Sequence, residues 1–230
     1  MKNMTNIIAG THLWRKKMAS NIAAATGQDC IYISKPEELS TTSLFTVNPQ
    51  YVFFTHWSNI IPQEVFESYE CIVFHMTDLP FGRGGSPLQN LISRGIYETK
   101  ISALRCVKEL DAGPVYMKRP LSLYGTAQEI YMRANVIIEE MIISIIKDKP
   151  KPIEQSGEPV IFKRRNELDG NVAQLETLEE VHDFIRMLDA DGYPCAFLEI
   201  NNLRLEFSRS SIKSDHLLAD VIIREIPHEK

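Results

Sequence analysis

Two side chains in the sequence, His75 and Asp111, are of the types that carry protons in enzymes. His75 ends the apolar run Cys71–His75, and Asp111 lies in the turn-like stretch 110–114 (Leu-Asp-Ala-Gly-Pro) after a second apolar run. If both reach loop ends and meet, the carboxylate can orient the imidazole for general acid–base catalysis. A lone histidine and a lone aspartate are more often solvated loop groups, so the chemistry depends on what positions them.

Short apolar runs predict the strands that would hold these residues. The runs are β-branched or aromatic and are bounded by turn-forming or charged residues: Asn6–Ala9, Ile31–Ile33, Tyr51–Thr55 and Cys71–His75. Between the first two, residues 13–26 suit a helix that Gly27 ends. This order predicts an α/β fold with a Rossmann-like, mostly parallel sheet and helices on both faces. Such sheets bind ligands at the carboxyl ends of their strands, where His75 falls.

The loop after His75 is rich in proline and glycine and leads into a helix. Gly82–Gly85 is a weak candidate for a phosphate-binding loop, because it follows a loop rather than a strand. The stretch 86–89 (Ser-Pro-Leu-Gln) predicts a helix start with a side-chain cap, and Gly95 would stop that helix.

The chain divides into two predicted domains. A capping box at 126–129 starts a long helix to about Lys147, and the stretch 147–152, with two prolines, is typical of a linker. We therefore expect a catalytic domain over residues 1–150 and a small α+β subdomain over 151–230. The subdomain contains a capping box and two alternating runs that suit a hairpin: 177–180, then 196–200 and 203–207 around Asn201–Asn202.

The composition argues against several classes of protein. A formal net charge of −5 and a pI near 5.7 give no basic field for a phosphate backbone, so a nucleic-acid substrate is disfavoured. Four scattered cysteines without a CxxC pair fit a reducing cytoplasm better than disulfides. No cluster has metal-ligand spacing, so we expect no metal. The N-terminus lacks signal-peptide features and no apolar stretch is long enough for a bilayer, so we expect a cytoplasmic protein without membrane contact.

The stretch from Phe74 to Tyr116 resembles the N10-formyltetrahydrofolate-dependent formyltransferases. Their motif is roughly Asn-x-His-x-Ser-x-Leu-Pro-x-x-Arg-Gly, then Pro, then Thr-Gly-x-Thr, then Asp-x-Gly. The resemblance is collinear from about Pro49. The matching residues stand in register: His75, Leu79, Pro80, Arg83, Gly84 and Pro87, followed by 98–102 and Asp111–Gly113.

The sequence departs from this motif at three positions. Thr77 stands in place of Ser, which keeps a hydroxyl, and Lys100 stands in place of Gly. The catalytic Asn of the family aligns with Val73, whose side chain cannot donate a hydrogen bond to a formyl oxygen. The nearest polar residues that could replace it follow the third predicted strand: His56, Ser58 and Asn59.

The resemblance implies a role for each matching residue. Protonated His75 would stabilise the oxyanion that forms when an amine attacks the formyl carbon, and Asp111 would support the imidazolium and relay the proton. The donor would be N10-formyltetrahydrofolate, framed by Ser58, Asn59, Ile60, Ile61, Thr77, Asp78, Leu79, Pro80, Arg83 and Glu109. The acceptor would meet His56, Trp57, Lys163 and Arg164.

Each acceptor contact has a structural alternative. Lys163 and Arg164 could approach a diphosphate, or they could form a solvated basic turn. Trp57, Tyr124 and Tyr193 could stack on a nucleobase, although such residues more often belong to a core. His56 could donate to the reacting oxygen or have a structural role.

The size and the short tail resemble sugar-nucleotide N-formyltransferases of the pseudaminic-acid-pathway type most. The expected acceptor is therefore the amino group of a UDP-linked 4-amino-4,6-dideoxyhexose. The alternatives are an amino acid on a carrier protein, as in the formylation domains of peptide synthetases, or on tRNA. A different class, a non-catalytic folate-binding relative, stays open because of Val73. The residues leave the sugar and the nucleotide open, and a homodimer is compatible with them.

Overall fold

The computed structural model describes residues 4–10 and 15–227. The described residues form two compact units that interleave along the sequence. Unit 1 is drawn from 1–83, 100–120 and 134–161, and unit 2 from 84–99, 121–133 and 162–230. The expected domains, 1–150 and 151–230, are each continuous in sequence, whereas here residues 151–161 belong to unit 1, in the segment that begins at residue 134.

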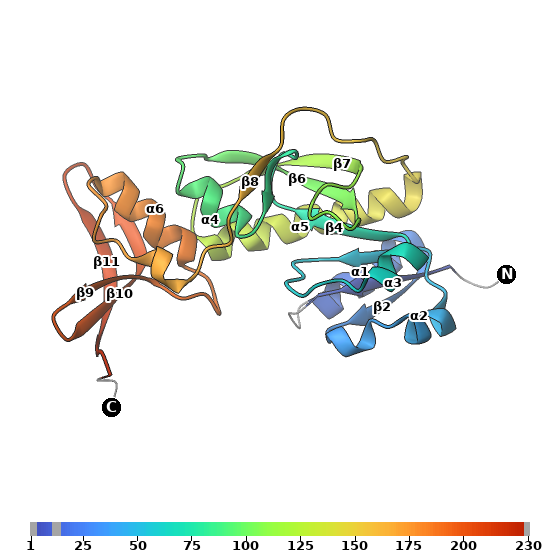
Figure 1. Ribbon diagram of the computed structural model, residues 1–230, viewed down its shortest axis with the longest axis horizontal. Helices are drawn as coiled ribbons and strands as arrows, with labels where there is room; N and C mark the ends of the chain where they lie inside the picture. The colour runs from blue at the N-terminus through green and yellow to red at the C-terminus, as the bar shows by residue number, and fades with distance from the viewer. Residues whose placement is uncertain (1–3, 11–14, 228–230) are drawn as a thin grey trace. The chain divides into compact units, whose positions relative to one another are not determined.

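A six-stranded sheet in the order β2-β1-β3-β4-β6-β7 organises the first part of the chain (Figure 1). β1 pairs in parallel with β2 and β3, β3 pairs in parallel with β4, and β4 pairs antiparallel with β6. The Rossmann-like, mostly parallel sheet with helices on both faces is therefore confirmed. The strand bounds are β1 Thr5–Ala9, β2 Asp29–Ile33, β3 Val52–Phe54, β4 Cys71–His75, β6 Glu98–Arg105 and β7 Val115–Ser122.

Short helices connect the parallel strands: α1 Arg15–Thr26, α2 Thr41–Val47 and α3 Gln63–Ser68, with a 3-10 turn η1 at Pro36–Glu38. Gly27 ends α1 with a φ of 69°, as predicted, and residues 13 and 14 lie outside the described residues. Fully buried apolar side chains from β1, β3 and α3, such as Ile7, Val52 and Val65, form the core beside these strands.

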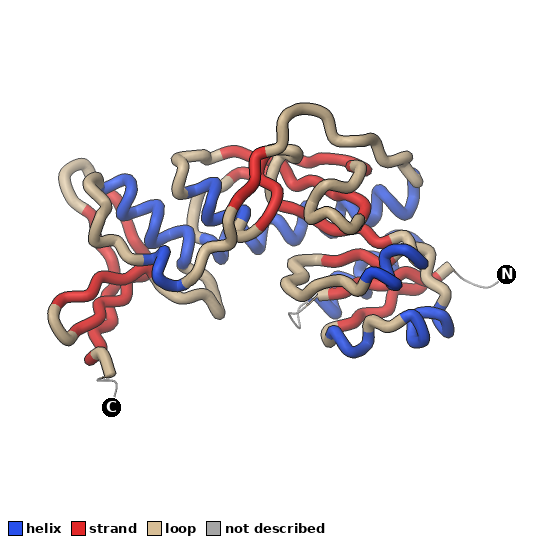
Figure 2. Tube along the Cα trace, in the orientation of Figure 1, coloured by secondary structure: helices blue, strands red, loops and turns tan. Residues whose placement is uncertain are grey.

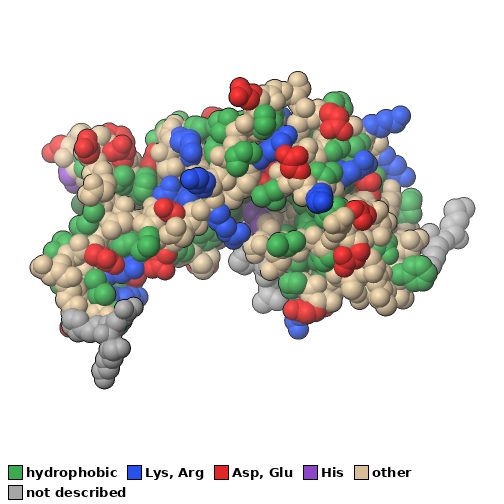
Figure 3. Space-filling model, viewed as in Figure 1, with side chains coloured by type: hydrophobic (Ala, Val, Ile, Leu, Met, Phe, Trp, Pro, Cys, Tyr) green, Lys and Arg blue, Asp and Glu red, His purple; other side chains and the backbone are tan. Residues whose placement is uncertain are grey.

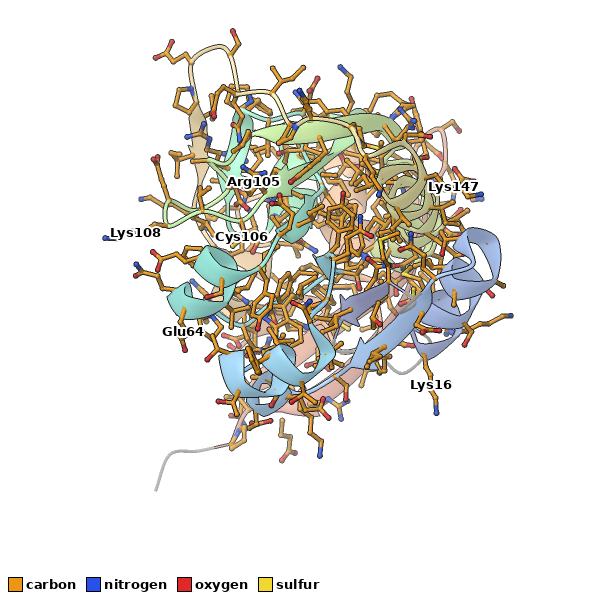
Figure 4. All side chains as sticks on the ribbon, turned by 90° about the vertical axis from the view of Figure 1, so that its right-hand side faces the viewer. Lys16, Glu64, Arg105, Cys106, Lys108 and Lys147 are labelled. Carbon is orange, nitrogen blue, oxygen red and sulfur yellow. The ribbon has the colours of Figure 1, made fainter. Side chains whose placement is uncertain are left out.

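The long helix α5, Ala127–Asp148, begins at the predicted capping box. The backbone N–H of Thr126 donates to the Glu129 carboxylate at 2.8 Å, and the N–H of Glu129 donates back to the Thr126 hydroxyl at 3.3 Å. Lys147 projects from its last turn, away from the packed interior, as Lys16 does from α1 and Glu64 from α3 (Figure 4). Among the described helices, none is long and apolar enough to cross a membrane.

The predicted side-chain cap of α4, Pro87–Ile92, is wrong. Ser86 has a left-handed φ of 49° and makes no capping bond, and its hydroxyl accepts the backbone N–H of Arg165 at 3.0 Å instead. The Gln89 amide likewise donates to the carbonyl oxygen of Met187. Hydrogen bonds to distant segments have replaced the local capping pattern.

The C-terminal part of unit 2 is a helix with a three-stranded antiparallel sheet (Figures 1 and 2). The capping box at Thr177 and the hairpin at Asn201, with φ 54°, are confirmed. Strand β11 was not predicted. Its elements are α6 Leu178–Leu188, β9 Ala196–Ile200, β10 Leu203–Ile212 and β11 Leu217–Glu225. The 3-10 turn η2, Glu167–Gly170, precedes them. A separate two-stranded sheet pairs β5, Phe81–Gly84, with β8, Val160–Phe162.

Candidate active site

The parallel strands of the sheet deliver several loops to one edge. β1, β3 and β4 run in the same direction, so the residues after their carboxyl ends share that edge. His75 is the last residue of β4 and only 8% exposed. The loop that begins at Thr55 leaves β3 at the same edge. A ligand crevice is therefore expected beside His75.

His75 and Asp111 come together, as the sequence predicted. Nδ1 of His75 lies 3.5 Å from Oδ2 of Asp111, and the two side chains are 10% and 11% exposed. Asp111 follows the end of β6 in a turn and has a φ of 54°. Partial burial strengthens the attraction between such charges relative to water. Their catalytic role stays a prediction.

The other ring nitrogen of His75 faces the loop of β5. Nε2 lies 2.7 Å from the carbonyl oxygen of Gly82, which also accepts the Thr77 hydroxyl at 3.3 Å. The Gly82 carbonyl oxygen can only accept, so Nε2 carries the hydrogen of that bond. Two donors, from His75 and Thr77, thus converge on one carbonyl oxygen.

Ser102 of β6 fixes the backbone immediately after His75. Its hydroxyl donates to the carbonyl oxygen of Thr77 at 2.7 Å and accepts the N–H of Leu79 at 3.3 Å. Ser102 and Thr77 are fully buried. The stretch 77–80, predicted to frame folate, is therefore held rigidly beside the histidine.

Lys100, at the position where the formyltransferase motif has Gly, forms an ion pair with Asp78. The Lys100 Nζ lies 2.9 Å from one Asp78 oxygen, and the Lys118 Nζ lies 2.6 Å from the other. Partial burial acts to raise the pKa of Asp78, but hydrogen bonds from Lys118 and Lys100 outweigh it and hold the pKa below its usual value. Asp78 therefore stays ionised at the edge of the site.

Arg83 and Glu109, both predicted to meet the folate, contact each other and a residue that the sequence did not indicate. Arg83 Nη1 lies 3.5 Å from Glu109, and Nε and Nη2 donate to the side-chain oxygen of Gln155 at 3.1 and 2.8 Å. Gln155 in turn donates to the carbonyl oxygens of Asp111 and Gly113, each at 2.8 Å. No local motif could have marked Gln155, because its partners lie far away in the sequence.

The loop after β3 carries the remaining predicted contacts of unit 1. His56, with a φ of 48°, donates from Nε2 to the side-chain oxygen of Asn135 on α5 at 3.1 Å. The structure thus places His56 against α5, while His75 binds Gly82 and Asp111. Trp57 and Ile61 pack on the core, and Ser58, Asn59 and Ile60 are exposed. Among the described residues, the buried indole N–H of Trp57 has no hydrogen-bond partner.

Val73 has the environment of a packed strand residue. It pairs with Phe54 of β3 and Leu104 of β6 and packs against the hydrophobic core. Cys106 follows β6 (Figure 4); burial first, and then the charge of Asp111, raise the pKa of its thiol to about 11. A thiol that stays protonated is a poor nucleophile, so Cys106 does not compete with His75 for the chemistry.

Lys163 and Arg164 belong to a basic cluster in unit 2, which we define as Arg94, Lys163, Arg164 and Arg165. Lysine and arginine side chains gather over α4 and the end of β8 (Figure 3). Burial lowers the pKa of Arg165; Asp169 opposes this effect and the charge of Arg94 adds to it. Together these four side chains make this part of unit 2 locally basic.

Two tyrosine pairs also belong to unit 2. Tyr124 is 61% exposed and stacks on Tyr97, with ring centres 5.1 Å apart. The hydroxyls of Tyr131 and Tyr193 lie 2.7 Å apart. Over residues 4–10 and 15–227, no three His, Cys, Asp or Glu side chains gather closely enough to hold a metal ion.

Comparison with known proteins identifies relatives along the whole chain. The family model for the C-terminal domain of methionyl-tRNA formyltransferase matches residues 167–224. A solved structure described as the methionyl-tRNA formyltransferase from Clostridium thermocellum is 47% identical. It superposes with a TM-score of 0.92 over 96% of this chain and 99% of its own.

More distant relatives include both tRNA and sugar enzymes. The methionyl-tRNA formyltransferase of Thermodesulfovibrio yellowstonii is 22% identical over 204 residues, 84% of this chain; the chain spans 66% of that relative, just under two thirds. A sugar N-formyltransferase from Shewanella sp. FDAARGOS_354 is 15% identical, with a TM-score of 0.72 over 92% of this chain and 99% of its own. This last likeness concerns the fold alone.

Proposed function

Because the chain belongs to the N10-formyltetrahydrofolate-dependent formyltransferase family, we propose that it transfers a formyl group from N10-formyltetrahydrofolate to a primary amine. The observation that carries the proposal is the partly buried contact of His75 with Asp111 at 3.5 Å. The site also fits the donor, because His75 and Thr77 already hold a carbonyl oxygen, that of Gly82, at one point. A formyl oxygen is a carbonyl oxygen with the same acceptor geometry.

In this reaction the amine nitrogen forms a bond to the formyl carbon, and the bond between that carbon and N10 breaks. Protonated His75 donates a hydrogen bond to the oxygen while negative charge builds on it, and Asp111 supports that imidazolium. Asp111 takes up the proton that the amine loses, and the same proton is relayed to the leaving N10 nitrogen. Buried Ser102 and Thr77 keep the residues after His75 from shifting during these steps.

For the acceptor, the comparisons favour the tRNA alternative over the sugar nucleotide. We infer that the acceptor is the α-amine of an aminoacyl-tRNA. The 47% identity to the Clostridium thermocellum protein supports this inference, and so does the family model over residues 167–224. The basic cluster in unit 2 offers a local site for phosphates despite the net charge of −5. The sugar nucleotide remains a competing acceptor, and the cytoplasmic location and homodimer stay predictions.

A single assay can test the donor and the acceptor together. The protein receives N10-formyltetrahydrofolate labelled in the formyl group, with methionyl-tRNA, a UDP-linked 4-amino-4,6-dideoxyhexose or an aminoacyl carrier protein. We expect label in methionyl-tRNA and none with the His75→Asn variant. Label in the sugar nucleotide alone would show that the sugar nucleotide is the acceptor, and the proposal of formyl transfer would still hold. Folate binding without transfer to any acceptor would instead favour a non-catalytic relative.

A further inference from the structure

All four hydrogen-bonding positions of the Gln155 amide are occupied. Its oxygen accepts from Nε and Nη2 of Arg83, and its nitrogen donates to the carbonyl oxygens of Asp111 and Gly113. A side-chain amide has two acceptor lone pairs and two donor hydrogens, so this set completes its capacity. The long loop that carries Gln155, between α5 and β8, is drawn in tan in Figure 2.

Arg83 determines which way this amide faces. A guanidinium has only donors, so it requires the amide oxygen on its side. The amide nitrogen must then point at the turn 111–113, whose two carbonyl oxygens are acceptors. The chemistry of the partners therefore fixes the orientation of Gln155 independently of how the amide atoms are assigned.

The turn that Gln155 holds is the turn that carries Asp111. Asp111 has a φ of 54°, a left-handed conformation that is unfavourable for most non-glycine residues. The two hydrogen bonds from Gln155 lie on either side of Ala112 and offset part of this cost. Gly113 packs so closely against β6 that a Cβ would overlap the carbonyl oxygen of Arg105.

We propose that Gln155 is a positioning residue that holds the Asp111 carboxylate against His75. This inference rests on the proposed function and adds a residue to it. The distance of 3.5 Å between Oδ2 and Nδ1 is already longer than a hydrogen bond, so a small further shift of the turn separates the pair. A displacement of about 1 Å at a reacting centre can cost on the order of 10²-fold in rate.

Two substitutions distinguish this role from one in which Gln155 only holds the Arg83 side chain. Gln155→Glu keeps an acceptor for the guanidinium but removes both donors and places a carboxylate against two carbonyl oxygens. Gln155→Leu removes all four hydrogen bonds. We expect both variants to lower kcat by about 10- to 10²-fold, with little change in the KM for N10-formyltetrahydrofolate. Wild-type kcat in Gln155→Glu would show that only the contact with Arg83 matters and would overturn the proposal.

Gln63→Leu is the matched control. Within residues 4–10 and 15–227, the Gln63 amide donates only to the exposed carboxylate of Glu67, one helical turn away on α3, at 2.6 Å. Its kcat should equal that of the wild type. A second test combines Gln155→Leu with Asp111→Asn: if Gln155 acts through Asp111, the double variant should be no slower than Asp111→Asn alone. Full additivity of the two losses would contradict the proposal.

A spectroscopic readout tests the geometry without turnover. In protein labelled with 15N-histidine, the His75 ring signals are identified by their loss in His75→Asn. In Gln155→Glu and Gln155→Leu they should move toward their positions in Asp111→Asn. Signals that coincide with those of the wild type would overturn the proposal. If the wild type transfers no formyl group at all, the proposed function fails, but these spectra still decide whether Gln155 positions Asp111.

Discussion

At the scale of single residues, the partners of the His75 ring define its chemistry. One nitrogen faces the Asp111 carboxylate and the other the carbonyl oxygen of Gly82, at 3.5 and 2.7 Å. The Gly82 carbonyl can only accept, so Nε2–H donates to it and Nδ1 faces the carboxylate. The carbonyl of Gly82 must yield its hydrogen bond for a substrate oxygen to take it.

Substitution of either member of this pair should abolish most of the activity. We expect His75→Asn and Asp111→Asn each to reduce kcat by roughly 10² or more, the contribution typical of general acid–base catalysis. The thermal midpoint should change little, because His75 is the last residue of β4 and Asp111 lies in a turn, and neither belongs to the apolar core. Steady-state kinetics with parallel melting curves check this, and a near-wild-type rate in either variant would exclude the mechanism.

Thr77 and His56 are the two candidates for the second hydrogen-bond donor to the oxyanion. The hydroxyl of Thr77 already donates to the oxygen that His75 binds, whereas His56 binds Asn135. We therefore expect Thr77→Val to lower kcat by about 10²-fold with KM nearly unchanged, as for loss of one oxyanion donor. Thr77→Ser should keep the rate, and His56→Ala should lower it less. If His56→Ala lowers kcat more than Thr77→Val does, His56 is the second donor.

Asp78 should make the stability of the protein depend on pH in the acid range. Its pKa is held below the ordinary 3.8 in the folded chain, so the ionised form stabilises the fold above that pH. This contribution is lost as the pH falls through the folded-state pKa. The Tm of Asp78→Asn should thus lie below that of the wild type at pH 7, and the difference should shrink below pH 4 or so. A difference that stays constant down to pH 2 or so would argue against the ion pairs.

At the scale of elements, local patterns predicted what depends on near neighbours. β1 to β4, the boxes at Thr126 and Thr177 and the hairpin at Asn201 all rest on residues within a few positions of one another. The cap at Ser86 failed because its hydroxyl binds the backbone of Arg165, 79 residues later. β11 was missed because its exposed positions include apolar side chains, such as Val221 and Ile223, which obscure the alternation.

The α6 capping box should contribute measurably to the stability of unit 2. The Thr177 hydroxyl accepts the N–H of Glu180 at 3.2 Å, and the Glu180 carboxylate accepts from Glu176 and Thr177 in return. Thr177→Ala should lower the free energy of unfolding by about 1 kcal/mol, and Thr177→Ser should retain most of it. Urea titrations with an unchanged m-value test this, and equal midpoints for Ala and wild type would show that the cap is not used.

At the scale of the whole molecule, the sequence predicted which residues meet in the candidate active site but not which residue holds the Asp111 turn. His75 and Asp111 were found because both match the formyltransferase motif in register. Gln155 lies outside every motif, and its partners Asp111 and Arg83 are 44 and 72 residues away. Such contacts depend on the folded path of the chain rather than on spacing.

Binding of the donor should stabilise the folded protein as a whole. A ligand that binds only the native state at 100 times its Kd adds about 2.7 kcal/mol to the free energy of unfolding. We therefore expect 5-formyltetrahydrofolate to raise Tm by several degrees, with the same rise in EDTA. Thermal scans at increasing folate concentration measure the effect. A Tm that does not respond to folate, or a response that EDTA removes, would contradict the expected donor site or its independence of metal.

Residues 151–161 belong to unit 1, and their position in the chain determines when Gln155 becomes available during synthesis on the ribosome. Asp111 is made 44 residues before Gln155, with the whole of α5 between them. At about 5–20 residues per second, roughly 2–9 s pass between the synthesis of Asp111 and that of Gln155, which donates to two carbonyl oxygens of the turn. The hydrogen bonds from Gln155 to the Asp111 turn can therefore form only after the whole of α5 has been synthesised. A chain that stalls near α5 would hold His75 in place without the contact that fixes its aspartate.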